Sequence, residues 1–295
     1  MGSLSSRIRA AVFPVAGLGS RFLPASKASP KEMFPIVDKP LVQYAVEEAV
    51  AAGAEKLVFV TSASKGAIED HFENHPELEN VLRKSGKEEL LALVRDIVPP
   101  QVSCTYIQQV QPLGLGHAVL CARPEIGDES FYVHLVDDLI LSERPCLDQM
   151  REHYERHEAS VLAVETVPRD QTANYGIVAT HEAAPGVKTV TKIVEKPKPE
   201  DAPSKLAVVG RYVLTPKIFD KLASTGSGAD NEIQLTDGIA SLLTEEPVHA
   251  LPFEGRRYDC GKKLGYLEAA VECGLRHPEI GRAFAAYLAA LSTGS

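Results

Sequence analysis

Short apolar runs alternate with helical patterns along the first two-thirds of the chain, and this alternation limits the possible folds most strongly. The apolar runs are bounded by Gly, Pro or charged residues, as buried strands are. They cover residues 8–15, 56–61, 103–108, 131–136, 161–167, 190–194 and 206–214. Residues 42–52, 88–97 and 146–157 lie between several of them with apolar side chains at helical spacing. Such alternation is typical of βαβ units, so we predict an α/β fold with a mostly parallel, doubly wound sheet.

The pattern changes after roughly residue 165. Strands crowd around a loop rich in proline and charge at residues 195–201, which predicts an antiparallel insertion that covers the end of the main sheet. Residues 262–291 read as helices with a break at His277-Pro278. A chain of 295 residues has room for one large domain with insertions or for two closely joined lobes.

The charge balance limits the possible partners. A formal net charge of -9 should repel nucleic acid and anionic membranes, so we expect neither as a partner. The first forty residues reverse this sign. They hold Arg7, Arg9, Arg21, Lys27, Lys31 and Lys39 against Glu32 and Asp38. Both a basic pocket for a small polyanion and a solvated turn fit this segment.

Cysteine usage and hydropathy predict a cytoplasmic protein. The 5 cysteines are scattered, without a C-x-x-C pair, which disfavours a disulfide framework or a zinc site and favours a reducing compartment. No apolar run approaches the roughly 18–20 residues that cross a bilayer. Residues 1–6 match the myristoylation pattern formally, but chance or a cloning scar explains the match better.

A glycine loop, Gly17-Leu18-Gly19, follows the first predicted strand. Glycines allow backbone N–H groups to approach an anion because no Cβ stands in the way. The dinucleotide fingerprint needs a third glycine where Phe22 stands, which disfavours an NAD-dependent dehydrogenase, and the Walker A spacing is absent. The loop is therefore a nucleotide cradle of another kind or a simple turn. Arg21 and Lys31 favour the cradle, because a triphosphate needs fixed positive charge.

Seven segments in order resemble the bacterial UTP–glucose-1-phosphate uridylyltransferases, members of the sugar-nucleotidyltransferase family. The resemblance spans residues 8 to 280 and is carried by residues 14–21 (PVAGLGSR), 30–33 (PKEM), 109 with 114–119 (GLGHAV), 194–197 (VEKP), 209–212 (VGRY), 232–237 (EIQLTD) and 259–265 (DCGKKLG). Relatives that transfer thymidylate have a double-glycine loop, G-G-x-G-T-R, instead of the first segment. The sequence departs from the family pattern at Val136 and Asp230.

The resemblance implies a fold and a division of the chain. The fold is a Rossmann-like mixed sheet of the nucleotide-diphospho-sugar transferase type, with an inserted antiparallel sugar-binding region and C-terminal helices. The single domain, residues 1–295, would have a nucleotide-binding part at about 8–165, a sugar-binding part at about 166–260 and C-terminal helices at about 261–292. A homodimer or homotetramer is expected from the same resemblance.

The resemblance also assigns roles on the nucleotide side. Ala16, Gly17 and Gly19 would contact the nucleotide through the backbone. Independently of the resemblance, Glu32 next to Lys31 fits either a hydrogen-bond acceptor for a base or a surface ion pair. Arg21 and Lys31 would bind the triphosphate. Gln109 and Gly114 would read the uracil edge, since a glutamine amide offers both a donor and an acceptor. Taken alone, Gln109 would read as a solvated polar residue at a strand end.

The remaining roles concern the metal and the sugar. Asp137 follows a buried run, at the strand end where ligands bind in open α/β sheets. With Asp259 it would hold Mg²⁺, although an isolated Asp at a strand end is more often a cap or turn former. The sugar phosphate would be bound by Lys196. Gly176, Val209 and Gly210 would line the sugar pocket through backbone groups, and Glu195 would accept hydrogen bonds from sugar hydroxyls. Without the family, residues 195–198 would read as a solvated charged loop.

The implied activity is transfer of a uridylyl group from UTP to glucose 1-phosphate, giving UDP-glucose and pyrophosphate by in-line attack on the α-phosphate. Two alternatives remain. A sister enzyme would use dTTP, CTP or another sugar 1-phosphate on the same scaffold. A catalytically inactive nucleotide-binding regulator would have lost a metal aspartate or a phosphate-binding cation.

Overall fold

The computed structural model describes residues 7–63, 65–226 and 232–293 of the chain. The myristoylation pattern at residues 1–6 and the departure at Asp230 lie outside the described residues. Among the described helices, none combines the length and the apolar character that crossing a membrane requires.

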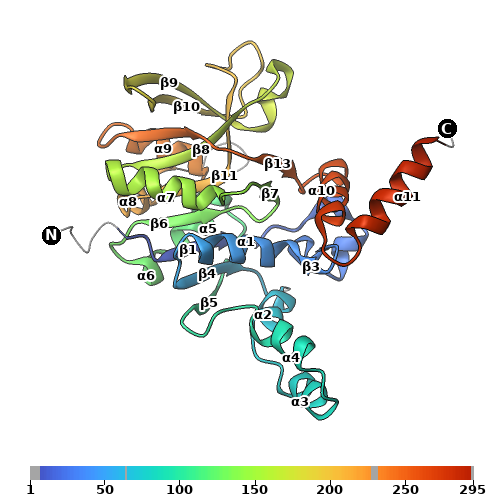
Figure 1. Ribbon diagram of the computed structural model, residues 1–295. Helices are drawn as coiled ribbons and strands as arrows, with labels where there is room; N and C mark the ends of the chain where they lie inside the picture. The colour runs from blue at the N-terminus through green and yellow to red at the C-terminus, as the bar shows by residue number, and fades with distance from the viewer. Residues whose placement is uncertain (1–6, 64, 227–231, 294–295) are drawn as a thin grey trace.

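A mixed sheet forms the centre of the molecule (Figure 1). In the described part of the chain it holds nine strands in the order β5-β4-β1-β6-β11-β8-β12-β10-β9. Neighbours in the first half are parallel: β5 (Ser103–Gln108), β4 (Lys56–Thr61), β1 (Ala10–Pro14) and β6 (Phe131–His134). β11 (Leu206–Leu214) runs antiparallel to both β6 and β8 (Ser160–Thr166), and β12 (Val248–Pro252) is parallel to β8.

Helices cover both faces of this sheet, as predicted for a doubly wound fold. α1 (Leu41–Ala51) and α7 (Cys146–His157) pack on one face, and α5 (Leu115–Cys121), α8 (Lys217–Ser224) and α9 (Leu235–Leu242) pack on the other. Successive side chains of a strand point to opposite faces. Phe13 of β1 therefore packs toward α1, while Val12 packs toward α5.

The predicted antiparallel insertion is present, but it continues the main sheet. β9 (Gly176–Ala184) and β10 (Val187–Glu195) form a hairpin, and β10 pairs with β12 at the sheet edge. The start of β9 also pairs with the start of β11. The insertion thus extends the sheet and does not cover its end as a separate layer, because the backbone groups of the β12 edge are satisfied by β10.

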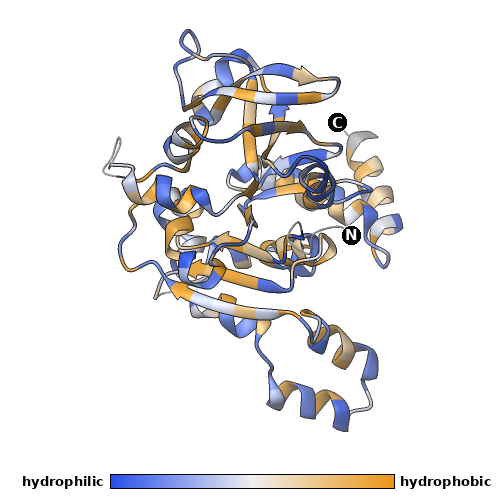
Figure 2. Ribbon diagram, turned by 90° about the vertical axis from the view of Figure 1, so that its left-hand side faces the viewer, coloured by the Kyte–Doolittle hydropathy of each residue, from blue (hydrophilic) through white to orange (hydrophobic). Residues whose placement is uncertain are grey.

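Several elements lie outside the central sheet. α2 (Gly66–Phe72), α3 (Pro76–Lys84) and α4 (Glu88–Arg95) follow β4, and α3 and α4 extend away from the sheet (Figures 1 and 2). α6 (Arg123–Ile126) follows α5, and the short strands β2 (Pro35–Ile36) and β3 (Lys39–Pro40) pair with each other. α10 (Lys263–Arg276) and α11 (Gly281–Thr293) end the described chain and confirm the expected break at His277-Pro278.

A separate antiparallel pair, β7 (Asp138–Leu141) and β13 (Arg256–Asp259), stands beside the main sheet. In its register Asp259 lies opposite Asp138, and the backbone N–H of Cys260 donates to the carbonyl of Asp137 at 2.7 Å. This pairing brings two segments that are more than a hundred residues apart in sequence to one place.

A buried ionic network joins α1, β6 and β11 beneath this place. Arg211, 1% exposed, donates from Nη2 to Glu48 Oε2 at 2.8 Å, and His134 Nε2 lies 3.2 Å from the same oxygen. Glu48 Oε1 also accepts from the backbone N–H of Leu147 at 3.0 Å. Burial alone would raise the pKa of Glu48, but Arg211 and His134 outweigh it and hold the pKa well below its usual range. The carboxylate is therefore charged, and its negative charge is matched by Arg211.

We predict that Glu48→Ala lowers the free energy of unfolding by about 3–5 kcal/mol, because it leaves the charge of Arg211 buried without a partner. Urea denaturation measures this loss. The matched control is Glu47→Ala, one position earlier in α1, where the side chain is 42% exposed and pairs with Lys39. That exposed pair should contribute no more than about 1 kcal/mol. Equal effects of the two substitutions would contradict the role of the network.

Candidate active site

The glycine loop lies at the carboxyl end of β1, at the edge where ligands bind in open α/β sheets. Gly19 has a left-handed backbone with φ 64°, and its carbonyl accepts from Ser26 Oγ at 2.8 Å. A 3-10 turn at Ser20–Phe22 follows. Gly19, Arg21 and Lys31 line a cavity of about 270 Å³, and Gly261 from the C-terminal part of the chain lines it as well. Two predicted phosphate-binding cations thus face one small cavity.

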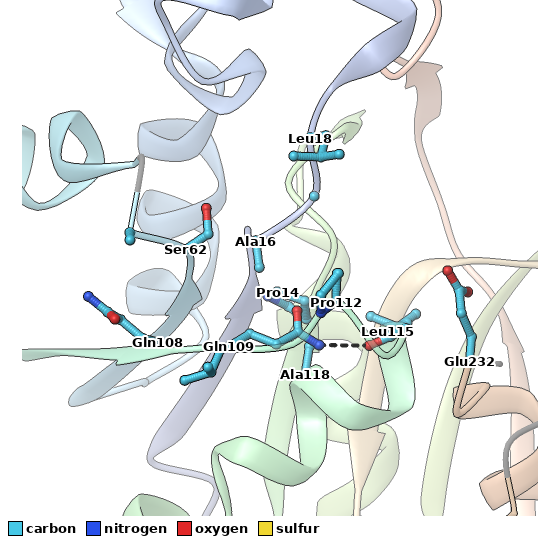
Figure 3. A pocket seen from close by; sticks show the side chains of 14 residues that line it. Pro14, Ala16, Leu18, Ser62, Gln108, Gln109, Pro112, Leu115, Ala118 and Glu232 are labelled. Carbon is cyan, nitrogen blue, oxygen red and sulfur yellow. Dashed lines mark hydrogen bonds between the residues drawn. The ribbon is translucent and has the colours of Figure 1, made fainter. Parts of the chain in front are cut away.

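A larger cavity of about 660 Å³ is lined by the start of the glycine loop (Figure 3). Ala16, Gly17, Gln109 and Gly114 line it, as does Leu115 at the start of α5. The lining is mostly apolar with a few polar groups, which suits a planar base. The structure therefore brings these four predicted nucleotide-binding residues to one cavity.

The Gln109 side chain is held from one side in this cavity. Its amide nitrogen donates to the Gly114 carbonyl at 3.1 Å and lies 3.0 Å from His117 Nδ1, and Figure 3 shows the first of these bonds. Within the described residues, the amide oxygen accepts no hydrogen bond from the protein. Gly114 has φ 93°, and a Cβ there would lie 2.8 Å from the Glu232 Cβ. The position requires glycine for both reasons.

A third cavity, of about 330 Å³, lies toward the insertion. The predicted sugar-side residues Gly176, Glu195, Lys196 and Gly210 line it together with Arg21, which also lines the small phosphate cavity. Lys196 has φ 42°, and its ammonium group lies 3.2 Å from Glu195 Oε1. A left-handed backbone at a residue other than glycine costs roughly 1–3 kcal/mol and is concentrated at functional sites.

The two predicted metal aspartates meet around Gly261. A Cβ on this glycine would lie 2.9 Å from Asp137 Oδ2 and 3.1 Å from Asp259 Oδ1, so the two oxygens are no further apart than the sum of these distances. Both residues line the third cavity. The described residues contain no cluster of three or more His, Cys, Asp or Glu side chains that would hold a metal by themselves. A pair of carboxylates with open space beside it fits Mg²⁺, which binds through one or two carboxylates and completes its shell with phosphates and water.

Each of these aspartates is paired with a lysine. Lys31 Nζ forms an ion pair with Asp137 Oδ2, and Lys262 Nζ lies 2.9 Å from Asp259 Oδ2. Burial lowers the pKa of Lys31, but the carboxylates of Asp137 and Glu32 outweigh burial and raise its pKa overall. Both lysines therefore carry a positive charge next to the carboxylate pair.

A third carboxylate, Asp138, stands beside the pair. Burial, followed by the charges of Asp137 and Asp259, raises the pKa of Asp138 to about 6, although Arg257 opposes this shift. Arg257 Nε donates to Asp138 Oδ1 at 2.6 Å. Sequence reasoning did not identify Arg257. Its position two residues before the predicted metal ligand Asp259 was the available signal.

Two predicted site residues, Val209 and Glu32, do not line any of the three cavities. Val209 is fully buried in the core, while its neighbours Val208 and Gly210 line the sugar-side cavity. Alternation along β11 explains this, because adjacent residues of a strand face opposite sides. Glu32 is 3% exposed and accepts from Lys65 Nζ at 2.7 Å. It does not line any of the three cavities above, so a direct contact between Glu32 and a base stays a prediction.

Val136, where the sequence differs from the family pattern, packs in the hydrophobic core. Its side chain is 3% exposed and packs in the cluster that includes α1 and α7, so it does not enter the carboxylate site. Lys65, which sequence reasoning missed, is buried between β4 and α2 and pairs with Glu32. Its place after a strand of the same parallel sheet was the signal that could have found it.

The chain is similar over most of its length to proteins of one known family. The model of the Nucleotidyl transferase family matches residues 11–274. The chain is 49% identical over 285 residues to the UTP–glucose-1-phosphate uridylyltransferase YngB of Bacillus subtilis, covering 97% of this chain and 96% of that protein. It is 48% identical over 282 residues to the enzyme of the same name from Streptococcus pneumoniae, covering 94% of each.

Solved structures resemble the whole fold. A UTP-bound UGPase from Acinetobacter baumannii has a TM-score of 0.88 and 44% identity, covering 95% of this chain and 98% of that one. A UDP-glucose pyrophosphorylase complexed with UDP-glucose has a TM-score of 0.80 and 43% identity, covering 89% and 97%. These matches confirm the predicted fold class.

We predict that Gly261→Ala weakens Mn²⁺ binding about tenfold or more while the fold remains intact. The new Cβ would press on the ends of two flexible side chains, Asp137 and Asp259, and would separate their carboxylates. Changes that displace metal ligands cost roughly 10–100-fold in affinity. Paramagnetic resonance of free Mn²⁺ measures the affinity. Gly66→Ala, where a Cβ meets open space, is the control, and unchanged binding in Gly261→Ala would show that the carboxylates do not share an ion.

Proposed function

The chain belongs to the nucleotidyl transferase family, and we propose that it transfers the uridylyl group of UTP to glucose 1-phosphate, giving UDP-glucose and pyrophosphate. The observation that carries this proposal is the end-to-end similarity to relatives named for that reaction. The local geometry supports it, since the polar cavity shares Leu115 and Glu232 with the base-sized cavity and Arg21 with the phosphate cavity.

The base cavity suits uracil in particular. The amide nitrogen of Gln109 is already engaged with Gly114 and His117, so its oxygen is turned into an acceptor for an N–H group. Uracil and thymine offer such an N–H at N3, whereas cytosine has an acceptor there. This geometry favours UTP over CTP. The preference over dTTP rests on the similarity to relatives named for UTP.

We propose Asp137 and Asp259 as the ligands of a Mg²⁺ ion, with their open side toward the substrate phosphates. A bound Mg²⁺ supplies charge neutralisation at phosphate oxygens. Lys31 and Lys262 balance the two carboxylates in the structure described here. When the aspartates hold a divalent ion, these lysines are free to pair with phosphate oxygens of the nucleotide and of the sugar phosphate.

The reaction we propose is a direct displacement. A phosphate oxygen of glucose 1-phosphate attacks the α-phosphorus of UTP, the bond to the bridging oxygen of the β-phosphate breaks, and pyrophosphate leaves. Two unit charges of the same sign at 4 Å repel by about 4 kcal/mol at an effective dielectric of 20, so bringing the two anions together is a large part of the barrier. Lys196 offsets this repulsion on the sugar side, and Arg21 and Lys31 stabilise the departing pyrophosphate.

The sugar itself would be bound by the insertion. Gly176 and Glu195, the first residue of β9 and the last of β10, lie opposite each other in the hairpin and line the cavity. A Cβ on Gly176 would lie 3.4 Å from Glu195 Oε2, so the glycine leaves this carboxylate open toward the cavity. Glu195 would accept hydrogen bonds from sugar hydroxyls. This assignment makes residues of about 166–260 the sugar-binding part and those of about 8–165 the nucleotide-binding part.

We also propose that the protein forms a homodimer or homotetramer through its C-terminal helices. α10 exposes apolar side chains along one face, and α11 extends from the body in Figure 1. The exposed residues on this surface are Leu264, Leu267, Val271, Leu275, Tyr287 and Leu291. An exposed apolar stripe of this kind is typical of an interaction surface.

The cysteines are free thiols, which supports a reducing compartment such as the cytoplasm.

The proposed activity is tested by pyrophosphate release from UTP and glucose 1-phosphate, with and without Mg²⁺. We expect release that requires both substrates and the metal. Lys196→Ala should lower kcat by at least about tenfold, since a charge next to the attacking phosphate is worth more than 1.4 kcal/mol in the transition state. No release with any pairing of nucleotide and sugar 1-phosphate would favour the regulator alternative.

The matched control for this lysine is Lys198→Ala. Lys198 lies on the same loop and is exposed, but it does not line the sugar-side cavity. It should keep the kcat of the wild type. Near-normal turnover of Lys196→Ala would remove Lys196 from the mechanism while leaving the overall activity assignment in place.

The oligomer proposal has its own measurement. We expect Leu267→Asp, at the centre of the α10 stripe, to shift the sedimentation coefficient toward that of a monomer, because it places a charge in the buried contact. Leu93→Asp on α4 is the control: Leu93 is 69% exposed but lies far from α10 in Figure 1. A monomeric wild type, or an unchanged oligomer in Leu267→Asp, would refute this interface.

A further inference from the structure

Arg257 is an almost fully buried arginine with two carboxylate partners. Its side chain is 7% exposed, and Nε donates to Asp138 Oδ1 at 2.6 Å. Nη1 donates to Glu165 Oε1 at 2.5 Å. The guanidinium also lies over the ring of Tyr175, 5.0 Å from its centroid. The rigid, planar guanidinium can bind two carboxylates and stack on an aromatic ring at the same time. A lysine ammonium group is a poor substitute for it.

The partners of Arg257 belong to different parts of the fold. Asp138 begins β7, Glu165 lies near the end of β8 in the main sheet, and Tyr175 immediately precedes β9. β7 and β13 pair with each other and not with the main sheet. Arg257 therefore links this separate strand pair to the central sheet through side-chain contacts.

The strand pair that Arg257 holds carries both carboxylates proposed for the metal. Asp137 immediately precedes β7, and Asp259 ends β13 two residues after Arg257. Asp138 adds a third negative charge next to them, in register with Asp259. Like charges at such short range drive the two strands apart unless a cation balances them. Arg257 is the buried cation that touches Asp138.

We propose that Arg257 is a positioning residue for the metal site: it holds β7 and β13 against the main sheet so that Asp137 and Asp259 stay close enough to share one divalent ion. The inference rests on the proposed function. The neighbouring Arg256 on the same strand has no such position. Its side chain is 66% exposed and pairs only loosely, at 3.6 Å, with Glu272 of α10. The two adjacent arginines thus offer a direct comparison.

The test measures UTP binding by calorimetry with and without Mn²⁺, in the absence of any sugar phosphate so that no turnover occurs. We expect wild-type protein and Arg256→Lys to bind UTP much more tightly when Mn²⁺ is present. Arg257→Lys should lose about tenfold or more of this Mn²⁺-dependent gain, since changes to residues that orient metal ligands typically cost 10–100-fold. UTP affinity without metal should not change, because Arg257 lines neither the base cavity nor the small phosphate cavity, and no sugar phosphate is present for the sugar-side cavity that it does line.

Glu165→Gln provides a second variant that leaves every charge next to the metal site in place. It removes one anchor of Arg257 at the main sheet and should reduce the Mn²⁺-dependent gain less than Arg257→Lys does. Thermal unfolding of each variant shows that it is folded. If both variants fold and both keep the full Mn²⁺-dependent gain in UTP affinity, the positioning role is overturned. If Arg257→Lys does not fold, a full gain in Glu165→Gln alone overturns it. A wild type that gains nothing from Mn²⁺ would instead contradict the proposed metal site itself.

Discussion

The arrangement of this site depends on holding carboxylates of the same charge close together. Asp137 and Asp259 meet around Gly261, where the absence of a side chain leaves room for both, and Asp138 stands beside them. Such a cluster is stable only when cations balance it. Lys31 and Lys262 do so from the open side, and Arg257 does so from the buried side. In the proposed reaction the open-side lysines would change partners when phosphates bind, whereas Arg257 is held in the interior by Asp138 and Glu165.

The rest of the molecule holds this cluster in place from beneath. The Glu48–Arg211 ion pair ties α1 to β11, and Arg211 also donates to the carbonyl of Leu135, two residues before Asp137. Apolar packing on both faces of the sheet fixes the strands from which the loops emerge. Binding groups are therefore carried by loops on a rigid frame, which is the usual way for α/β proteins to combine stability with a working site.

Local patterns were sufficient for most of the central elements. The predicted runs 56–61, 103–108 and 206–214 coincide with β4, β5 and β11, and residues 146–157 coincide with α7. These segments are buried and strongly periodic, so their pattern is unambiguous. β7, β12 and β13 were not predicted, because they are short and owe their stability to pairing with distant strands. The same limit explains why the antiparallel insertion was predicted, but not its pairing with β12 as a continuation of the main sheet.

The amino-acid sequence alone predicted the fold class, the family and most of the residues that the structure brings to the three cavities, since periodicity and ordered motifs are local properties of the chain. Only the tertiary structure decided which charges meet. The Val209 side chain points into the core, and Glu32 pairs with Lys65. Arg257 lies between Asp138 and Glu165. The physical reason is that an ion pair depends on distance in space. Strand register and the direction of each side chain set that distance, and neither is visible in the spacing of residues along the chain.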